Sequence, residues 1–250
     1  VCLVDAGGRV LSASCVRPCE EGMKVSTNSD KVVHARKTVV ELLMSDHPSP
    51  CTRERHSGDC ELERIARVDG VTAPRFPKRL DPKGQDDSSF SIFVDHEACI
   101  LCDRCIRGCG EIRNNNVLAR RGKGFKAGIA FDFNQQMANS SCISCGECMV
   151  SCPTGALTEK SMQKAGQPVE AVKTTCAYCG VGCSFKAELQ GDQVVRMEPY
   201  KDGGANEGHS CVKGRFAWGY ASHPDRVLSP MIRESIDQPW RQVSWDEAIQ

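Results

Sequence analysis

Residues 142–153 read CISCGECMVSCP, and this stretch decides what kind of fold the chain can form. Its four cysteines follow the pattern C-x2-C-x2-C-x3-C, and a proline comes directly after the last one. The same spacing stands 43 residues earlier, where residues 99–110 read CILCDRCIRGCG. Such an internal repeat predicts two equivalent metal-binding halves within one unit.

The spacing indicates which metal group the two halves bind. A single tetrahedral zinc usually takes two separated C-x2-C pairs. A 4Fe–4S cube is larger, and each thiolate binds a different corner iron. Three cysteines on one loop reach three corners, and the fourth points to the neighbouring cube. We therefore expect one cluster on Cys99, Cys102, Cys105 and Cys152, and another on Cys142, Cys145, Cys148 and Cys109. Structural zinc is the alternative, and Gly110 replaces the proline expected in the first half.

The composition agrees with a fold that depends on metal. The 250 residues include 17 cysteines but only 6% aromatics, and the mean hydropathy is −0.37. The chain starts with no apolar leader, so we expect reduced thiols in the cytoplasm. The net charge is zero, which disfavours nucleic acid as a partner, and no apolar run is long enough for a membrane span. The first residue is not methionine and SWDEAIQ resembles the start of a helix, so we expect a fragment of a longer polypeptide.

Local patterns predict several elements. The runs LVDA and RVLSAS read as two short strands around a turn at residues 7–8. Helices are expected over residues 36–45 and 60–67, and a linker over residues 69–89. FKAEL and QVVRM predict a hairpin around residues 191–192, and the basic run at 120–126 reads as a solvated loop.

A third cysteine group has a different spacing. Cys176, Cys179, Cys183 and Cys211 form C-x2-C-x3-C-x27-C, in the stretches TTCAYCGVGCSF and CVKGRF. These stretches resemble the iron–sulfur entry of molybdopterin oxidoreductases, and AYCGVGC is most similar to formate dehydrogenases. HPDRVLSPMIR and SWDEAIQ resemble the segments that follow in that family. A zinc ribbon is the alternative for these cysteines.

The resemblance implies a 4Fe–4S cluster on this third group and a molybdenum bis-pterin guanine dinucleotide beyond residue 250. It also implies that Lys213 lies between cluster and pterin, where the plain alternative is a surface lysine. The residues that convert formate to CO2 in that family, a selenocysteine or cysteine with a histidine and an arginine, are expected outside this chain.

The amino-terminal residues VCLVDAGGRVLSASCVRPCEEGM resemble the second half of a plant-type 2Fe–2S domain, as in NAD-linked formate dehydrogenases and the large iron–sulfur subunit of complex I. The resemblance makes Cys2 and Cys15 the third and fourth ligands. The first two would precede residue 1, so this chain alone cannot complete the 2Fe–2S cluster. Cys19 lies outside the pattern and reads as a buried or spare thiol.

A further site resembles the His-x3-Cys-x2-Cys-x5-Cys pattern of a His-ligated 4Fe–4S cluster in the same proteins. Here it would use His47, Cys51 and Cys60, but Glu54 stands at the middle cysteine position. A carboxylate is a hard replacement for a soft thiolate. Either His56 or Cys19 supplies the missing corner, or the site is degenerate; without the resemblance, His47 is simply a histidine at a helix end.

These patterns together predict an α+β, multi-cluster iron–sulfur protein. The expected units are residues 1–30 (part of a 2Fe–2S ferredoxin-type domain), 31–80 (a helical His/Cys segment), 88–162 (a ferredoxin-like domain with two 4Fe–4S clusters), 170–226 (a small β-containing 4Fe–4S domain) and 227–250 (the start of a molybdopterin domain).

The expected function is the electron-transfer portion of a formate dehydrogenase alpha subunit, passing electrons to a flavin subunit that reduces NAD or to another acceptor. Two other iron–sulfur proteins are alternatives. A complex I subunit normally lacks the two cysteine quartets at 99–152. An iron-only hydrogenase has them, but the cysteines of its catalytic cluster should follow in place of the C-x2-C-x3-C-x27-C group. From a different class, a zinc-stabilised binding module is disfavoured by the neutral charge and few aromatics.

Overall fold

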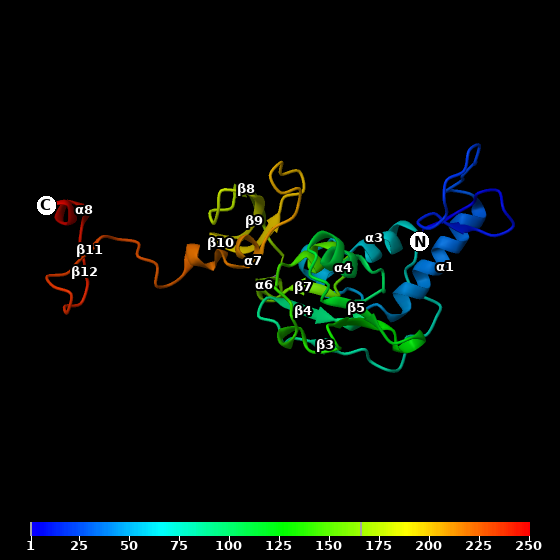
Figure 1. Cartoon of the computed structure of the whole chain (residues 1–250), viewed down its shortest axis with the longest axis horizontal. Coiled ribbons are helices and arrows are strands. Elements are labelled where there is room, and N and C mark those ends of the chain that lie inside the picture. The colour runs from blue at the N-terminus through cyan, green and yellow to red at the C-terminus, as the bar shows by residue number, and fades with distance from the viewer. Residues whose placement is uncertain (1, 166) are drawn as a thin grey trace.

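The structure is a computed structural model, and it describes residues 2–165 and 167–250. The chain is elongated, with helix α1 at one end and the carboxyl-terminal segment at the other (Figure 1). Helices and short sheets are mixed along the chain, which confirms the expected α+β class.

The amino-terminal part combines a small hairpin with a long helix. Strand β1 (Leu3–Val4) pairs antiparallel with β2 (Ser12–Ala13). Helix α1 (Asp30–Asp46) begins six residues earlier than predicted and ends where His47 becomes extended, before Pro48. Its Val40 packs with Ala66 and Val71 in a small apolar cluster, so α1 is held against α3 (Glu61–Val68).

Two short helices come next. Helix α2 (Thr52–Ser57) ends at Gly58, whose left-handed φ of 64° stops the helix. Helix α3 (Glu61–Val68) confirms the helix predicted through residues 60–67. The predicted linker at 69–89 contains no helix among its described residues and only the two-residue strand β3 (Gln85–Asp86).

The central unit is built from two small antiparallel sheets. Strand β4 (Ile92–Asp95) lies between β3 and β7 (Leu157–Glu159), while β5 (Leu118–Arg121) pairs with β6 (Gly128–Phe131). The 3-10 turns are η1 (His96–Ala98), η3 (Gly124–Lys126) and η4 (Met137–Asn139). The basic run at 120–126 was predicted as a loop, but its first two residues belong to β5.

Three short helical segments carry cysteines of the two quartets. They are α4 (Arg104–Arg107), the π-helical turn η2 (Gly108–Ile112) and α5 (Glu147–Ser151). Buried Ile92, Val94 and Leu157 share one core with the buried cysteines of both quartets. The thiols are thus part of the core, as the low aromatic content suggests.

Helix α6 (Lys160–Ala165) leads into a three-stranded sheet. Its order is β10 (Gln193–Pro199), β9 (Ser184–Gln190) and β8 (Glu170–Thr175), all antiparallel. The β9–β10 hairpin confirms the prediction, whereas β8 was not predicted. Helix α7 (Val212–Phe216) and the 3-10 segment η5 (Trp218–Ser222) complete this unit.

The last residues extend away from the other units (Figure 1). They form the two-residue strands β11 (Met231–Ile232) and β12 (Arg241–Gln242), then α8 (Trp245–Ile249). The Ser244 hydroxyl accepts a hydrogen bond from the Glu247 amide (3.2 Å) and caps α8, which confirms the helix expected from SWDEAIQ. Among the described residues, no helix is long and apolar enough to cross a membrane.

Candidate metal centres

The two C-x2-C-x2-C-x3-C loops fold alike. Leu101 and Ser144 occupy equivalent positions and both have a left-handed backbone, with φ of 56° and 53°. Asp103 and Gly146 are likewise equivalent, with φ of 62° and 77°. These turns curl each loop so that its first three thiols face a common centre. The repeat in the sequence is therefore a repeat in conformation.

The fourth cysteine of each loop turns to the other loop's centre. One cavity is lined by Cys99, Cys102, Cys105 and Cys152, and a second one by Cys109, Cys142, Cys145 and Cys148. The structure thus brings together the two sets that the exchange predicts. Four thiols around a buried cavity are the donor set that a 4Fe–4S cluster takes, so the residues fit the group.

Burial makes these thiols dependent on a cation. Burial is the main cause that raises the pKa of Cys105, and the neighbouring Cys152 raises it further. Burial likewise raises the pKa of Cys148, followed by its thiol neighbours. A set of thiolates is therefore costly here without bound metal, and metal binding should contribute directly to folding.

The third quartet lies in the sheet unit. Cys176, Cys179 and Cys183 stand on the turn between β8 and β9, where the Cys176 amide donates to the Cys183 carbonyl (2.8 Å). Burial, and then the nearby thiols of the other three members, raise the pKa of Cys183. The turn and the start of α7 lie side by side, since a Cβ on Gly214 would lie 3.1 Å from Cys176 Sγ, so the four cysteines gather in one region as the predicted cluster requires.

Cys211 approaches this quartet from the start of α7. A hydrogen bond from the Gly214 amide lowers the pKa of Cys211, and burial opposes this shift only in part. A lowered pKa favours the thiolate that a metal binds. Gly214 is required here, since a Cβ would lie 2.7 Å from Phe185 Cζ and 3.1 Å from Cys176 Sγ. Lys213 is exposed on α7, and its place in an electron path stays a prediction.

Direct contacts join the third quartet's unit to the second loop. The Glu147 carboxylate is 2% exposed and lies 3.0 Å from Arg113 Nη2 and 3.1 Å from His209 Nδ1. Arg113 also donates to the Ser210 carbonyl (2.6 Å), and Ser210 precedes Cys211. The quartet of Cys109, Cys142, Cys145 and Cys148 is thus the one that faces the sheet unit.

The quartet completed by Cys152 faces the amino-terminal part. Arg53 Nη1 donates to the Cys152 carbonyl (2.7 Å), and the Glu61 amide donates to the Pro153 carbonyl (2.8 Å). Gly155 lies so close that a Cβ there would be 3.0 Å from Cys51 Sγ. These contacts therefore place the groups in the order third quartet, second-loop centre, first-loop centre and His47 region.

The His47 region gathers three of the predicted residues around a fourth that was not predicted. His47, Cys51 and Cys60 lie with Glu63, and one ligand atom from each falls within 4.8 Å of all the others. Glu54 turns away: its carboxylate accepts from the Cys60 amide (3.0 Å) and pairs with Arg67 (2.7 Å).

Neither proposed substitute for the missing corner belongs to this group. His56 is not among the four grouped residues, and Cys19 is an exposed thiol. The sequence signal for Glu63 is its position three residues after Cys60, one turn into α3. The amino-terminal hairpin brings Cys2 beside Ser14, whose amide donates to the Cys2 carbonyl (2.9 Å). Cys2 and Cys15 are both exposed.

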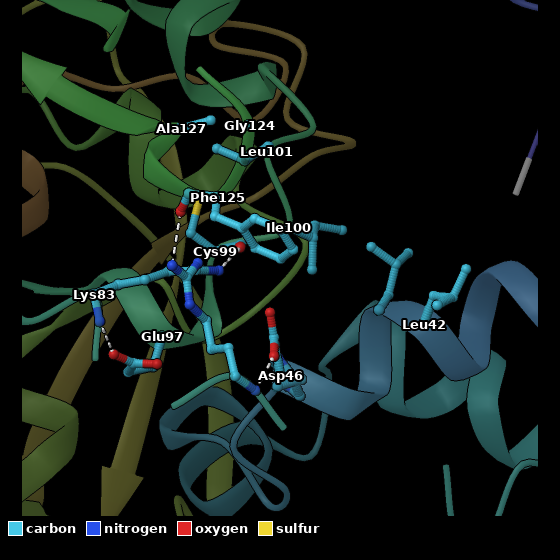
Figure 2. A pocket seen from close by; sticks show the side chains of 13 residues that line it. Leu42, Asp46, Lys83, Glu97, Cys99, Ile100, Leu101, Gly124, Phe125 and Ala127 are labelled. Atoms are coloured by element: carbon cyan, nitrogen blue, oxygen red, sulfur yellow. Dashed lines mark hydrogen bonds between the residues drawn. The ribbon is translucent and has the colours of Figure 1, made fainter. Parts of the chain in front are cut away.

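A cavity of about 360 Å³ lies between the end of α1 and the Cys99 loop (Figure 2). Its charged side chains are engaged with the backbone, since Asp46 accepts from the Arg79 amide (2.9 Å) and Arg79 Nη2 donates to the Phe125 carbonyl (2.7 Å). Glu97 accepts from the Lys83 amide. The cavity is thus a space between two units, and the carboxylates and the arginine named here are used in contacts that hold these units together.

Known proteins share these features. Residues 169–223 match the molybdopterin oxidoreductase Fe4S4 domain, and residues 139–158 match a 4Fe–4S binding domain. Both matches are to iron–sulfur domains, and the first is a domain of molybdopterin oxidoreductases. The first match contains the whole third quartet and Lys213, and the second contains the cysteines of the second loop.

Similarity extends over nearly the whole chain. Proteins named "Putative formate dehydrogenase" from Staphylococcus haemolyticus (strain JCSC1435) and Staphylococcus aureus (strain USA300) are each 27% identical, and the alignments cover 99% of this chain. The chain spans only 29% of the length of these relatives. A chain of a crystallised NAD+-reducing [NiFe]-hydrogenase in its H2-reduced state is 29% identical, with a TM-score of 0.58, over 64% of this chain and 68% of that one.

Proposed function

We propose that this chain is the electron-transfer portion of a formate dehydrogenase, which carries electrons from a molybdopterin site toward an NAD-reducing or other acceptor subunit. The observation that carries the proposal is the serial placement of three cysteine quartets: two line a cavity each, and the third gathers on the β8–β9 turn and the start of α7. Each 4Fe–4S cluster supplies a one-electron carrier when it is bound.

The contacts between units support the order of this relay. The sheet unit, which matches the molybdopterin oxidoreductase domain, contacts the second loop through Glu147, Arg113 and His209. The two ferredoxin-like quartets share one core. The amino-terminal units follow. The expected path is therefore from the Cys176–Cys211 quartet to the two ferredoxin-like quartets (the central pair), and then toward the amino-terminal units.

The chain's own residues contribute position and exclusion of water. Cys105, Cys109, Cys148 and Cys152 are buried, so two thiols of each of the two central quartets are shielded from water. Burial raises the pKa of Cys99 and Cys142, and the backbone amides of Leu101 and Ser144 partly oppose this shift. Amide bonds of this kind and burial are the features that set cluster potentials.

The comparisons support the two ends of the proposed path. The staphylococcal relatives supply formate as the electron donor by their name, and the hydrogenase supplies NAD+ as an acceptor by its title. The similarity to the hydrogenase chain offers a second candidate function, electron transfer in an enzyme that oxidises hydrogen. The match of residues 169–223 to a molybdopterin domain favours formate.

The test is formate-dependent reduction of the clusters in the full-length protein. Under anaerobic conditions, formate should bleach the iron–sulfur absorbance and give paramagnetic signals from reduced clusters. Cys179→Ser, which removes one thiol of the third quartet, should abolish reduction of the central pair by formate but not by dithionite. Reduction by formate that is unchanged in this variant, or a colourless chain that holds only zinc, would refute the proposal.

A further inference from the structure

The group of His47, Cys51, Cys60 and Glu63 differs in size from the three quartets. Among the described residues it is the one group of three or more His, Cys, Asp or Glu ligand atoms that all lie within 4.8 Å of one another. The quartet thiols do not meet this limit, although two of the quartets line one cavity each. In a cubane each ligand binds a different iron, so its ligands stand farther apart than those of a single ion.

The measured separations suit a single tetrahedral ion. His47 Nε2 lies 3.3 Å from Glu63 Oε1 and 3.8 Å from Cys60 Sγ. Around one zinc with bonds of about 2.3 Å to sulfur and about 2.0 Å to nitrogen and oxygen, these pairs would be about 3.3 and 3.5 Å apart. All four residues are buried, which is typical of a closed structural site.

Glu54 does not contribute a ligand, and its contacts explain why. Its Oε2 accepts the Cys60 amide (3.0 Å) at the start of α3, and its Oε1 pairs with Arg67 (2.7 Å). It therefore caps a helix from outside the site. The carboxylate in the third position of α3, Glu63, would usually cap that amide itself. It is free to face His47 because Glu54 has taken over the cap.

Other groups hold the Glu63 carboxylate in place. Its Oε1 accepts from the Cys51 amide (2.8 Å) and its Oε2 from the Ser49 hydroxyl (3.1 Å). Hydrogen bonds of this kind fix the orientation of metal-binding carboxylates. The ring atom Nδ1 of His47 is buried and has no partner, so the contacts of this ring lie on its Nε2 side.

We propose that His47, Cys51, Cys60 and Glu63 bind one zinc ion, in place of the fourth 4Fe–4S cluster that the spacing around His47 suggests. Two thiolates, an imidazole and a carboxylate form a donor set that zinc accepts. The ion would join the end of α1 to the starts of α2 and α3. Zinc undergoes no redox change, so this site would stabilise the fold and carry no electrons.

The test measures zinc and iron in the full chain after anaerobic purification and cluster assembly. The wild type should hold about one zinc and about twelve iron atoms, four for each of three cubanes. Glu63→Gln should weaken zinc binding by more than about tenfold and leave the iron unchanged. Two matched variants should keep zinc: Glu61→Gln, on the same helix and paired with Arg104, and Glu54→Gln, in the cap.

X-ray absorption at the zinc edge provides a second readout if Glu63→Gln fails to fold. The wild-type spectrum should show two sulfur neighbours at about 2.3 Å and two nitrogen or oxygen neighbours at about 2.0 Å. Absence of zinc, a shell of four sulfurs, about sixteen irons with a fourth cubane signal, or full zinc retention in a folded Glu63→Gln chain would overturn the proposal. None of these results depends on formate, so the proposed function is tested separately.

Discussion

Gly146 is the position where the contact between the sheet unit and the second cysteine loop can be tested most directly. Its backbone is left-handed, with φ of 77°. A Cβ at this position would lie 2.4 Å from Arg215 Cδ, 2.6 Å from Arg215 Nε and 3.1 Å from Phe216 Cζ. Arg215 is 2% exposed, so its side chain has little space into which to move.

Gly146→Ala should therefore weaken the docking of the two units. The left-handed backbone costs an alanine about 1–2 kcal/mol, and overpacking against a buried side chain costs about 1–3 kcal/mol more. Gly191→Ala is the matched control, since Gly191 has φ of 60° in the β9–β10 turn and no atom within 4 Å of the added Cβ. The difference between the variants isolates the contact with Arg215.

The assay is urea unfolding of the cluster-loaded chain without oxygen, followed by cluster absorbance, with proteolysis between α6 and β8 as a second readout. Gly146→Ala should lose about 1–3 kcal/mol more than Gly191→Ala and should be cut faster in that connection. Magnetic coupling between reduced clusters should also weaken, while the iron content stays the same. Equal losses in the two variants would show that the units do not pack through Arg215.

Three other perturbations have defined outcomes. Burial raises the pKa of Glu159 to about 7 from 4.5, so the folded state favours the protonated acid and stability should fall as pH rises through that interval. Glu159→Gln should remove this pH dependence and gain about 3 kcal/mol of stability at pH 8. An unchanged pH dependence of thermal unfolding in this variant would contradict the prediction. Glu147→Gln leaves Arg113 and His209 without their shared carboxylate and should cost about 2 kcal/mol in urea unfolding, whereas an unaltered midpoint would mean that the contact contributes nothing. Iron removal by a chelator should unfold residues 95–160, and survival of their circular dichroism and resistance to proteolysis would disprove metal dependence.

The parts of the fold that the sequence predicted best are those with local signals. The β9–β10 hairpin has a glycine turn between two alternating runs, and α3 has its apolar residues on one face. Strand β8 was missed because it is an edge strand whose six residues are all exposed, so no alternation marks it. Helix α1 was predicted too short because its first turn offers little apolar pattern: Val32 is buried there, but Asp30 and Lys31 are polar and Val33 is exposed.

The candidate sites show the same division. The cysteine quartets could be paired from spacing, because ligation geometry restricts which thiols can converge. The role of Glu63 could not be read in this way. It depends on α3 being turned toward the end of α1, and on Glu54 capping α3 from another helix. These contacts join residues that are 6 to 12 positions apart in the chain, and only the folded structure brings them together.

The exchange of fourth cysteines is the central claim, and paired substitutions test it most directly. Cys102→Ser disables the first cluster and Cys145→Ser the second, and Cys152→Ser is then added to each. We predict that Cys152→Ser leaves the surviving cluster of the Cys102→Ser chain intact but removes the surviving cluster of the Cys145→Ser chain, by iron content and paramagnetic spectrum. The opposite pattern would show that Cys152 binds the cluster of its own loop, which would contradict the account.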